Sequence, residues 1–319
     1  MDAQREPAWR YTLRRVRRHL HWARTEGVGR LVEEDQLDPR ERVRTALAKR
    51  AWRRRHGVAP GTARPVYVVG LQRSGTNMLM RGLEQAPEVE VRNENDRTVF
   101  DRFRLRSEAR LRETVLASRH THVVVKPLCD SQRVDELLDL AGMAPARAVW
   151  CYRDVDGRAR SEVSKFGESN LSALRAIAAG EADGMWQADR LPESTVETIR
   201  RLDPATMSVY DGAALFWWAR NRLYFDLGLD RRADLILSSY EEFVRDPEGT
   251  MRDLCRHIDF PYRPELVAHV EARTTHGTAP LDIHPEIRSL CVELRTDLDR
   301  ALAEQRARLA PGRQGGNHE

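Results

Sequence analysis

The sequence predicts an α/β protein built as a three-layer sandwich, with a mostly parallel central sheet flanked by helices. The first observation is that short runs of β-branched residues alternate along the chain with longer segments of helical periodicity. The second is a glycine-containing turn that joins the first such run directly to a helix. The third is length, because 319 residues provide ample chain for the core of one large domain.

The beginning of the chain is predicted to be distinct from the main domain. Three segments are expected: a basic helical extension over residues 1–64, a main domain over 65–310 and a flexible tail over 311–319. In the extension, hydrophobic residues recur at helical spacing with arginines on the other face: Trp9, Leu13, Val16 and Leu20. Such a helix either packs on the main domain or makes a peripheral contact with a membrane surface or an acidic partner.

Composition narrows the class of protein. With 41% hydrophobic and 32% charged residues, the chain reads as a soluble globular protein, and no apolar run approaches the roughly 18 residues of a membrane span. Arginines interrupt any apolar N-terminal run, so no signal peptide is predicted and a cytoplasmic location is expected. A net charge of +4 suits a polyanionic ligand, whereas the basic cluster at 49–55 has too few aromatic residues to predict nucleic-acid binding.

The four cysteines predict neither a metal site nor a disulfide framework. They are scattered, without a Cys-x-x-Cys pair: Cys129, Cys151, Cys255 and Cys291. The sequence also lacks an H-E-x-x-H motif and an acidic cluster at ligand spacing. Reduced thiols and a metal-free site are therefore expected.

The first half of the main domain is expected to contain three strands. Val66–Val69 is a short β-branched run bounded by a proline and a glycine, which predicts a buried parallel strand. The remaining expected elements follow in order: a helix over 77–85, a short strand over 88–92, a charged surface helix over 97–119 and a strand over 122–126.

The second half continues the alternation. The expected elements are a helix over 131–141, a strand over 147–152, a helix from 156, a helix over 211–229, a strand over 234–238 and helices from 246 and 285. Phe216, Trp217 and Trp218 in the long helix are interpreted as core residues. Residues 167–204 show no sharp pattern, so loops and short helices that shape an acceptor pocket are expected there.

The turn after the first strand predicts a phosphate-binding loop. Gly70 and Gly75 allow the chain to wrap tightly and to aim successive backbone N–H groups at one point, at the start of a helix. The hydroxyls of Ser74 and Thr76 add donors, and Arg73 adds a planar guanidinium suited to phosphate oxygens.

This loop resembles a Walker A motif, but Thr76 and Asn77 stand where that motif has lysine and serine or threonine. It is similar instead to the 5′-phosphosulfate loop of sulfotransferases that use 3′-phosphoadenosine 5′-phosphosulfate (PAPS), in which a basic residue precedes Ser-Gly-Thr. The resemblance implies a P-loop-like fold for residues 65–310. It also implies that the donor is bound by the loop residues Gln72, Arg73, Ser74, Gly75, Thr76 and Asn77, with Gln72 replacing a common proline.

Two further segments match the same family. Arg153 follows a strand and Ser161 lies at the spacing of the family's 3′-phosphate site, so the resemblance implies that both hold this phosphate. Tyr240, in a Tyr-Glu segment after a late strand, is implied to lie near the adenine; a half-buried tyrosine of no special role is the alternative. Residues 273–278 are only a weak substitute for the segment that completes the 3′-phosphate site in cytosolic members.

The resemblance also implies catalytic roles. Sulfonyl transfer requires a base for the acceptor, stabilisation of the leaving phosphate and alignment of the two substrates. Arg73 is expected to stabilise the leaving group. The histidine used by some members is absent after Lys126, so Glu94, at the spacing of the tyrosyl-protein enzymes, is the expected base and Asp96 its rival. Lys126 either orients the sulfonate or acceptor, or pairs with a carboxylate.

The function predicted from sequence is thus a PAPS-dependent sulfotransferase that acts on a hydroxyl or amine. One alternative is a nucleotide kinase or triphosphatase; another is a nucleotide-binding or membrane-associated protein that works through its basic N-terminal helix. The acceptor, whether a small molecule, a carbohydrate, a lipid or a peptide tyrosine, is left open by the sequence, as is the oligomeric state.

Overall fold

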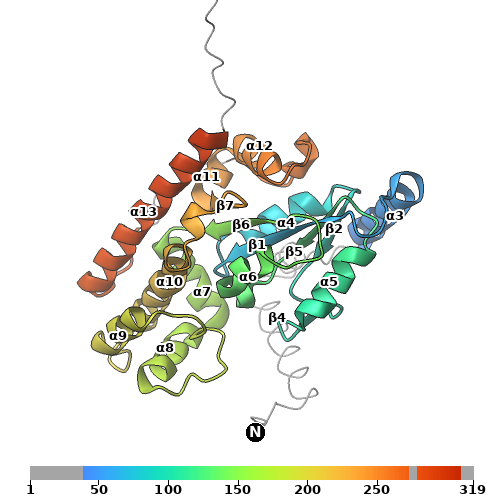
Figure 1. Ribbon diagram of the computed structural model, residues 1–319. Coiled ribbons are helices and arrows are strands. Elements are labelled where there is room, and N and C mark those ends of the chain that lie inside the picture. The colour runs from blue at the N-terminus through green and yellow to red at the C-terminus, as the bar shows by residue number, and fades with distance from the viewer. Residues whose placement is uncertain (1–38, 273–278, 310–319) are drawn as a thin grey trace, which may run out of the picture. The chain divides into compact units, whose positions relative to one another are not determined.

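The computed structural model describes residues 39–272 and 279–309 of the chain (Figure 1). Two compact units are distinguished, Met1–Trp52 and Arg53–Glu319, and their boundary falls within α3 (Pro39–His56). The basic cluster predicted over 49–55 lies on this helix. The amphipathic stripe predicted from Trp9 to Leu20, the tail over 311–319 and the segment over 273–278 lie outside the described residues.

The second unit is built on a five-stranded sheet. The strands are β1 (Arg64–Gly70), β2 (Val89–Arg92), β5 (His122–Val125), β6 (Arg147–Tyr152) and β7 (Leu235–Ser239). They lie in the order β2-β5-β1-β6-β7, and every pairing is parallel. The strand order reverses at β1, which pairs with β5 on one side and β6 on the other.

Helices cover both faces of the sheet because alternate side chains of each strand point to opposite sides. Val66 and Val68 join one hydrophobic cluster with α4 (Thr76–Glu84), α11 (Tyr240–Arg245) and α12 (Pro247–His257). Tyr67 and Val69 join the other cluster, on the opposite face. The helices that contribute to this second cluster are α5 (Glu108–Ala117), α6 (Val134–Leu138), α7 (Val155–Phe166), α8 (Ser169–Ala179), α9 (Glu193–Arg201), α10 (Val209–Asp226) and α13 (Pro285–Leu309).

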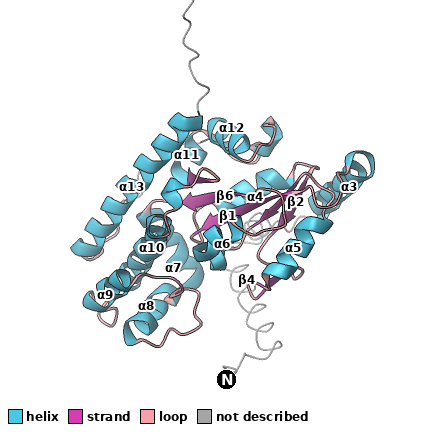
Figure 2. Ribbon diagram, in the orientation of Figure 1, coloured by secondary structure: helices cyan, strands magenta, loops and turns pink. Residues whose placement is uncertain are grey.

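Figure 2 shows the strands enclosed between these helices. The predicted α/β three-layer sandwich with a parallel central sheet is therefore confirmed. The strands read as continuous apolar runs because both of their faces are buried: all residues of β5 and of β7 are buried.

The single helix predicted over residues 97–119 is wrong. The structure has a two-stranded hairpin, β3 (Phe100–Asp101) and β4 (Arg104–Leu105), and only then α5. The turn between the two strands places Arg102 and Phe103 at positive φ, at 49° and 71°. Helix α5 begins where the side chain of Ser107 accepts a hydrogen bond from the backbone N–H of Arg110. The many charged residues of this segment suggested one continuous surface helix, so the turn at Arg102 and Phe103 and the cap at Ser107 were not recognised in the sequence.

Residues 167–204 contain loops and two short helices, in agreement with the prediction. Helix α8 buries Leu171, Leu174 and Ile177 at helical spacing, and α9 buries Ile199. The helix predicted over 131–141 is a 3₁₀ segment, η1 (Leu128–Arg133), followed by the short α6. The other predicted elements of residues 65–309 agree with the structure apart from their ends. Two more short 3₁₀ segments occur among the described residues, η2 (Leu229–Arg231) and η3 (Pro264–Leu266).

Candidate functional site

The carboxyl ends of the three central strands carry most of the predicted site. The phosphate loop follows β1, Lys126 follows β5 and Arg153 follows β6. These strands are parallel neighbours, so their carboxyl ends share one edge of the sheet. The strand order reverses at β1, and ligands of open α/β sheets bind at such a reversal.

The backbone of the phosphate loop is tightly wound. Gly70 has φ of 114°, and a Cβ there would lie 2.2 Å from the carbonyl oxygen of Cys151, so the adjacent strand leaves room only for glycine. The backbone N–H of Gly70 donates to Oγ of buried Ser131, 3.0 Å away, which ties the loop to η1. Arg73 also lies in the left-handed region, with φ of 70°.

The start of α4 offers donors to a ligand. Gly75, at φ of 86°, precedes the helix, and no side chain caps its first turn. Ser74 is 2% exposed, and its Oγ has no hydrogen-bond partner. Thr76 is buried and Asn77 exposed on the first turn. A buried hydroxyl without a partner beside uncapped N–H groups fits an anion with several acceptor oxygens.

The two predicted phosphate-binding segments meet directly. Nε of Arg73 donates a 2.8 Å hydrogen bond to Oγ of Ser161, which lies on α7. Helix α7 starts where the carboxylate of Asp154 accepts a hydrogen bond from the backbone N–H of Gly157 at 2.7 Å. This cap positions the helix so that Ser161 reaches the loop.

Arg153 and Tyr240 stack beside the same loop. The guanidinium carbon of Arg153 lies 4.1 Å from the centre of the Tyr240 ring. A Cβ on Gly75 would lie 2.8 Å from Cδ2 of Tyr240, so the ring packs against the loop as well. Nε of Arg153 is buried without a hydrogen-bond partner and lies 4.0 Å from the carboxylate of Asp154.

The core residue Trp217 also supports Arg153. Its side chain is fully buried, as predicted, and its Nε1–H donates to the carbonyl oxygen of Arg153 at 2.9 Å. The nearby carboxylate of Asp156 is engaged elsewhere, in an ion pair with Arg288 at 2.9 Å. The guanidinium of Arg153 thus keeps a donor for a further ligand.

Glu94 and Lys126 lie together with Asn77. Nζ of Lys126 donates to Oδ1 of Asn77 at 2.6 Å and lies 3.7 Å from Oε2 of Glu94. Burial raises the pKa of the half-buried Glu94 carboxyl, against the opposing attraction of Lys126, and the nearby charge of Asp130 raises it further. A carboxyl with a raised pKa is a better proton acceptor than an ordinary glutamate.

Asp96, the rival base, has structural partners. Its carboxylate forms an ion pair with Arg92 at 2.7 Å and accepts a hydrogen bond from the backbone N–H of Thr98 at 2.8 Å. Burial acts to raise the pKa of Asp96, but the hydrogen bonds to Arg92 and Thr98 outweigh it and the pKa is lowered. This geometry favours Glu94 over Asp96 as a base.

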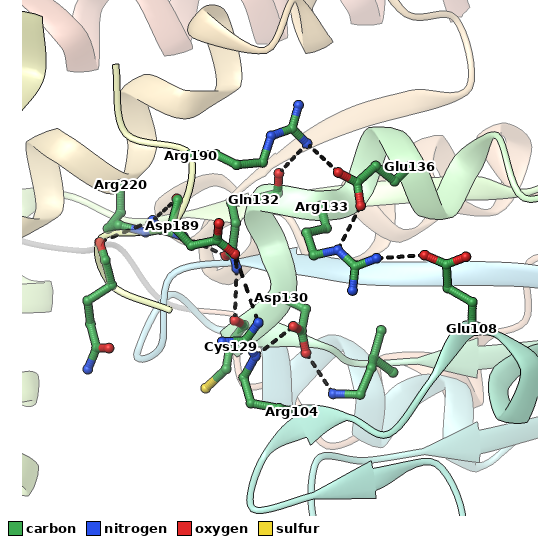
Figure 3. A network of polar contacts seen from close by, with 12 residues as sticks. Arg104, Glu108, Cys129, Asp130, Gln132, Arg133, Glu136, Asp189, Arg190 and Arg220 are labelled. Carbon is green, nitrogen blue, oxygen red and sulfur yellow. Dashed lines mark hydrogen bonds and ion pairs between the residues drawn. The ribbon is translucent and has the colours of Figure 1, made fainter. Parts of the chain in front are cut away.

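The sequence interpretation missed a polar network that includes Asp130 and Gln132 (Figure 3). The charge of Asp130 also acts on Glu94. Asp130, 1% exposed, accepts hydrogen bonds from Nε of Arg104 and from the backbone N–H of Leu105, both at 2.7 Å. Buried Arg220 of α10 donates to Oε1 of Gln132 at 2.6 Å. These contacts hold the β3–β4 hairpin and α10 to η1. The position of Asp130 shortly after a strand end was the signal that could have identified it.

No group of three or more metal-ligating side chains occurs in residues 39–272 and 279–309. No helix among the described elements is long and apolar enough to span a membrane.

Comparisons with known proteins extend this description. No curated protein matches the chain. Solved structures that are similar include a sulfotransferase from Alicyclobacillus acidocaldarius, at 18% identity and a TM-score of 0.39, covering 78% of this chain and 97% of that one. The sulfotransferase domain of the Synechococcus PCC 7002 olefin synthase is 14% identical with a TM-score of 0.39, and the match covers 73% of this chain and 95% of that domain. The sulfotransferase domain from the curacin biosynthetic pathway is 15% identical with a TM-score of 0.40, and the match covers 80% of this chain and 99% of that domain.

A family model matches the part of the chain that carries the site. The model is described as "Sulfotransferase family" and matches residues 65–264. This range includes the phosphate loop, Glu94, Lys126, Arg153, Ser161 and Tyr240. The chain therefore belongs to the sulfotransferase family.

Proposed function

We propose that this protein transfers a sulfonyl group from PAPS to an acceptor hydroxyl or amine. The observation that carries the proposal is the hydrogen bond between Arg73 and Ser161, at 2.8 Å. It joins the loop that would bind the 5′-phosphosulfate to the segment that would bind the 3′-phosphate.

The residues present fit this donor. The phosphate loop, from Gln72 to Asn77, would hold the 5′-phosphosulfate through its N–H groups and the partnerless hydroxyl of Ser74. Arg153, whose Nε also has no hydrogen-bond partner, and Ser161 would hold the 3′-phosphate. Tyr240, packed against Gly75 and Arg153, would contact the adenine.

The reaction assigns one role to each charged residue of the site. The carboxylate of Glu94 takes the proton of the acceptor, whose oxygen or nitrogen attacks sulfur in line with the bond to the phosphate oxygen. That sulfur–oxygen bond breaks, and 3′,5′-adenosine bisphosphate leaves with the bonding electrons. Arg73 stabilises the charge that grows on the leaving phosphate, and Lys126 orients the sulfonate.

The kinase or triphosphatase alternative is not favoured. Family membership argues against it, and Thr76 and Asn77 stand in place of the Walker lysine and its following hydroxyl residue. The proposal that the basic N-terminal helix contacts a membrane or an acidic partner concerns residues outside the described part of the chain. We further propose that this protein is cytoplasmic and that its acceptor is a small molecule, a carbohydrate or a lipid.

Thermal-shift titration tests the donor. Increasing 3′,5′-adenosine bisphosphate should stabilise the protein by about 2.7 kcal/mol at 100 times its dissociation constant, whereas ATP with magnesium should not. Arg153→Ala should abolish this response. Arg200→Ala is the matched control, because Arg200 lies on α9 and its side chain is exposed and paired with Glu193. A response to ATP with magnesium alone, or an unchanged response in Arg153→Ala, would contradict the proposal.

A further inference from the structure

A buried arginine connects the phosphate loop to the helical layer behind it. Arg158 lies on α7 and is 1% exposed. Its Nε donates to the carbonyl oxygen of Gln72 at 3.2 Å, and one terminal nitrogen donates to the carbonyl oxygen of Ala213, on α10, at 3.3 Å. In the sequence alone, Arg158 is one of several arginines near the start of this helix and has no evident role.

The first of these contacts sets the orientation of a loop peptide. The C=O and N–H of a trans peptide point in opposite directions, and no cis peptide occurs among the described residues. Because the Gln72 carbonyl faces the guanidinium of Arg158, the N–H of Arg73 points away from that guanidinium. Arg73 has φ of 70°, a conformation that a residue with a Cβ keeps only when its surroundings hold it.

The charges around Arg158 suit an anion in the loop. Burial lowers the pKa of Arg158 to about 10; the carboxylate of Glu162, on the same helix, opposes this shift, and the repulsion of Arg73 adds to it. Two guanidinium groups therefore lie close to one loop, one of them out of contact with solvent. A phosphate bound by the loop would relieve their repulsion.

We propose that Arg158 is a positioning residue that holds the Gln72 carbonyl, and so turns the N–H of Arg73 toward the 5′-phosphate end of the donor. This inference rests on the proposed function. A purely structural role, in which Arg158 only joins α7 to α10, is the competing explanation.

Calorimetric titration with two nucleotides separates these explanations. 3′,5′-Adenosine bisphosphate carries the phosphate that the loop would bind, whereas adenosine 3′-monophosphate lacks it. Arg158→Met, which removes the donors but keeps much of the volume, should weaken binding of the bisphosphate about tenfold and that of the monophosphate about twofold at most. Arg158→Lys, with one donor group and the charge retained, should restore part of the loss.

Arg220→Met is the matched control. Arg220 is 3% exposed, also donates to backbone carbonyl groups, those of Gln187 and Asp189, and makes none of its described contacts with the phosphate loop. Its substitution should lower the melting temperature without changing the ratio of the two affinities. If the Arg158 variants also show a lower melting temperature with an unchanged ratio of the two affinities, the inference is overturned.

Two other outcomes are equally decisive. If Arg158→Met does not fold, the affinity ratio of Arg158→Lys decides, and a wild-type ratio there overturns the inference. If the wild-type protein binds neither nucleotide, the proposed function itself fails and this inference fails with it. Selective loss of bisphosphate binding in an otherwise folded variant supports both.

Discussion

Replacing Glu94 with glutamine tests the proposed base most directly. The change keeps the size of the side chain but removes the group that accepts the proton. Loss of a general base typically lowers kcat by about 10² to 10⁴-fold, which corresponds to about 2.7 to 5.4 kcal/mol of transition-state stabilisation. The binding of 3′,5′-adenosine bisphosphate should change little, because Glu94 belongs to the acceptor side of the proposed site.

The structure also predicts the effect on stability. At 3.7 Å from Lys126, the Glu94 carboxylate gains an attraction of about 4 kcal/mol at an effective dielectric constant of about 20. Burial nevertheless dominates, because the pKa of Glu94 is raised in the folded protein. A raised carboxyl pKa means that the neutral form stabilises the fold at low pH, and that this contribution is lost as pH rises through the folded pKa. Glu94→Gln should therefore be at least as stable as the wild type at pH 7.

Asp96→Asn is the matched control. Asp96 pairs with Arg92 and accepts the N–H of Thr98, so its replacement should lower the free energy of unfolding by about 1 kcal/mol. The kcat of this variant should stay within a few-fold of the wild-type value. Glu94→Gln is thus expected to lose activity and keep its stability, whereas Asp96→Asn is expected to keep its activity and lose stability.

The assay is the release of 3′,5′-adenosine bisphosphate from PAPS in the presence of an acceptor found by screening, with urea unfolding run in parallel. The acid limb of the wild-type kcat profile should lie above the pKa of an ordinary glutamate and disappear in Glu94→Gln. A Glu94→Gln variant that keeps kcat within tenfold of the wild type, or an Asp96→Asn variant that loses activity instead, would refute Glu94 as the base.

Three further predictions concern single contacts. Gly75→Ala places a Cβ at φ of 86° and 2.8 Å from Tyr240, so urea unfolding should show a loss of about 1 to 2 kcal/mol; an unchanged stability would contradict the geometry. Ser161→Ala removes the acceptor of the Arg73 hydrogen bond, so calorimetry should show about fivefold weaker bisphosphate binding, and equal affinity would count against this site. Burial lowers the pKa of His257 to about 4, so the free energy of unfolding of the wild type should fall by about 2 kcal/mol between pH 7 and pH 5, because the unfolded chain takes up the proton. The His257→Gln variant should lose this pH dependence. A pH dependence as steep as that of the wild type would disprove the assignment to His257.

Much of the fold follows from features that are local in sequence. The apolar run of β1, the glycines at 70 and 75 and the uncapped helix start that follows them belong to one continuous stretch, so the strand, the loop and α4 could be predicted together. The alternation of strands and helices then determined a parallel sheet, because a parallel crossover needs a covering element. The motifs around Arg73, Arg153 and Tyr240 were likewise sufficient for the family, and the structure brings all three residues to one edge of the sheet.

Only the tertiary structure decided which charged groups are buried and what they contact. The hairpin before α5 depends on positive φ angles at Arg102 and Phe103, which residues of these types rarely adopt in isolation. Asp130, Arg158 and Arg220 look like ordinary surface charges in sequence, yet each is nearly inaccessible to solvent and bonded to segments far along the chain. Periodicity and turn chemistry act over a few residues, whereas burial and pKa depend on segments that meet only when the chain has folded.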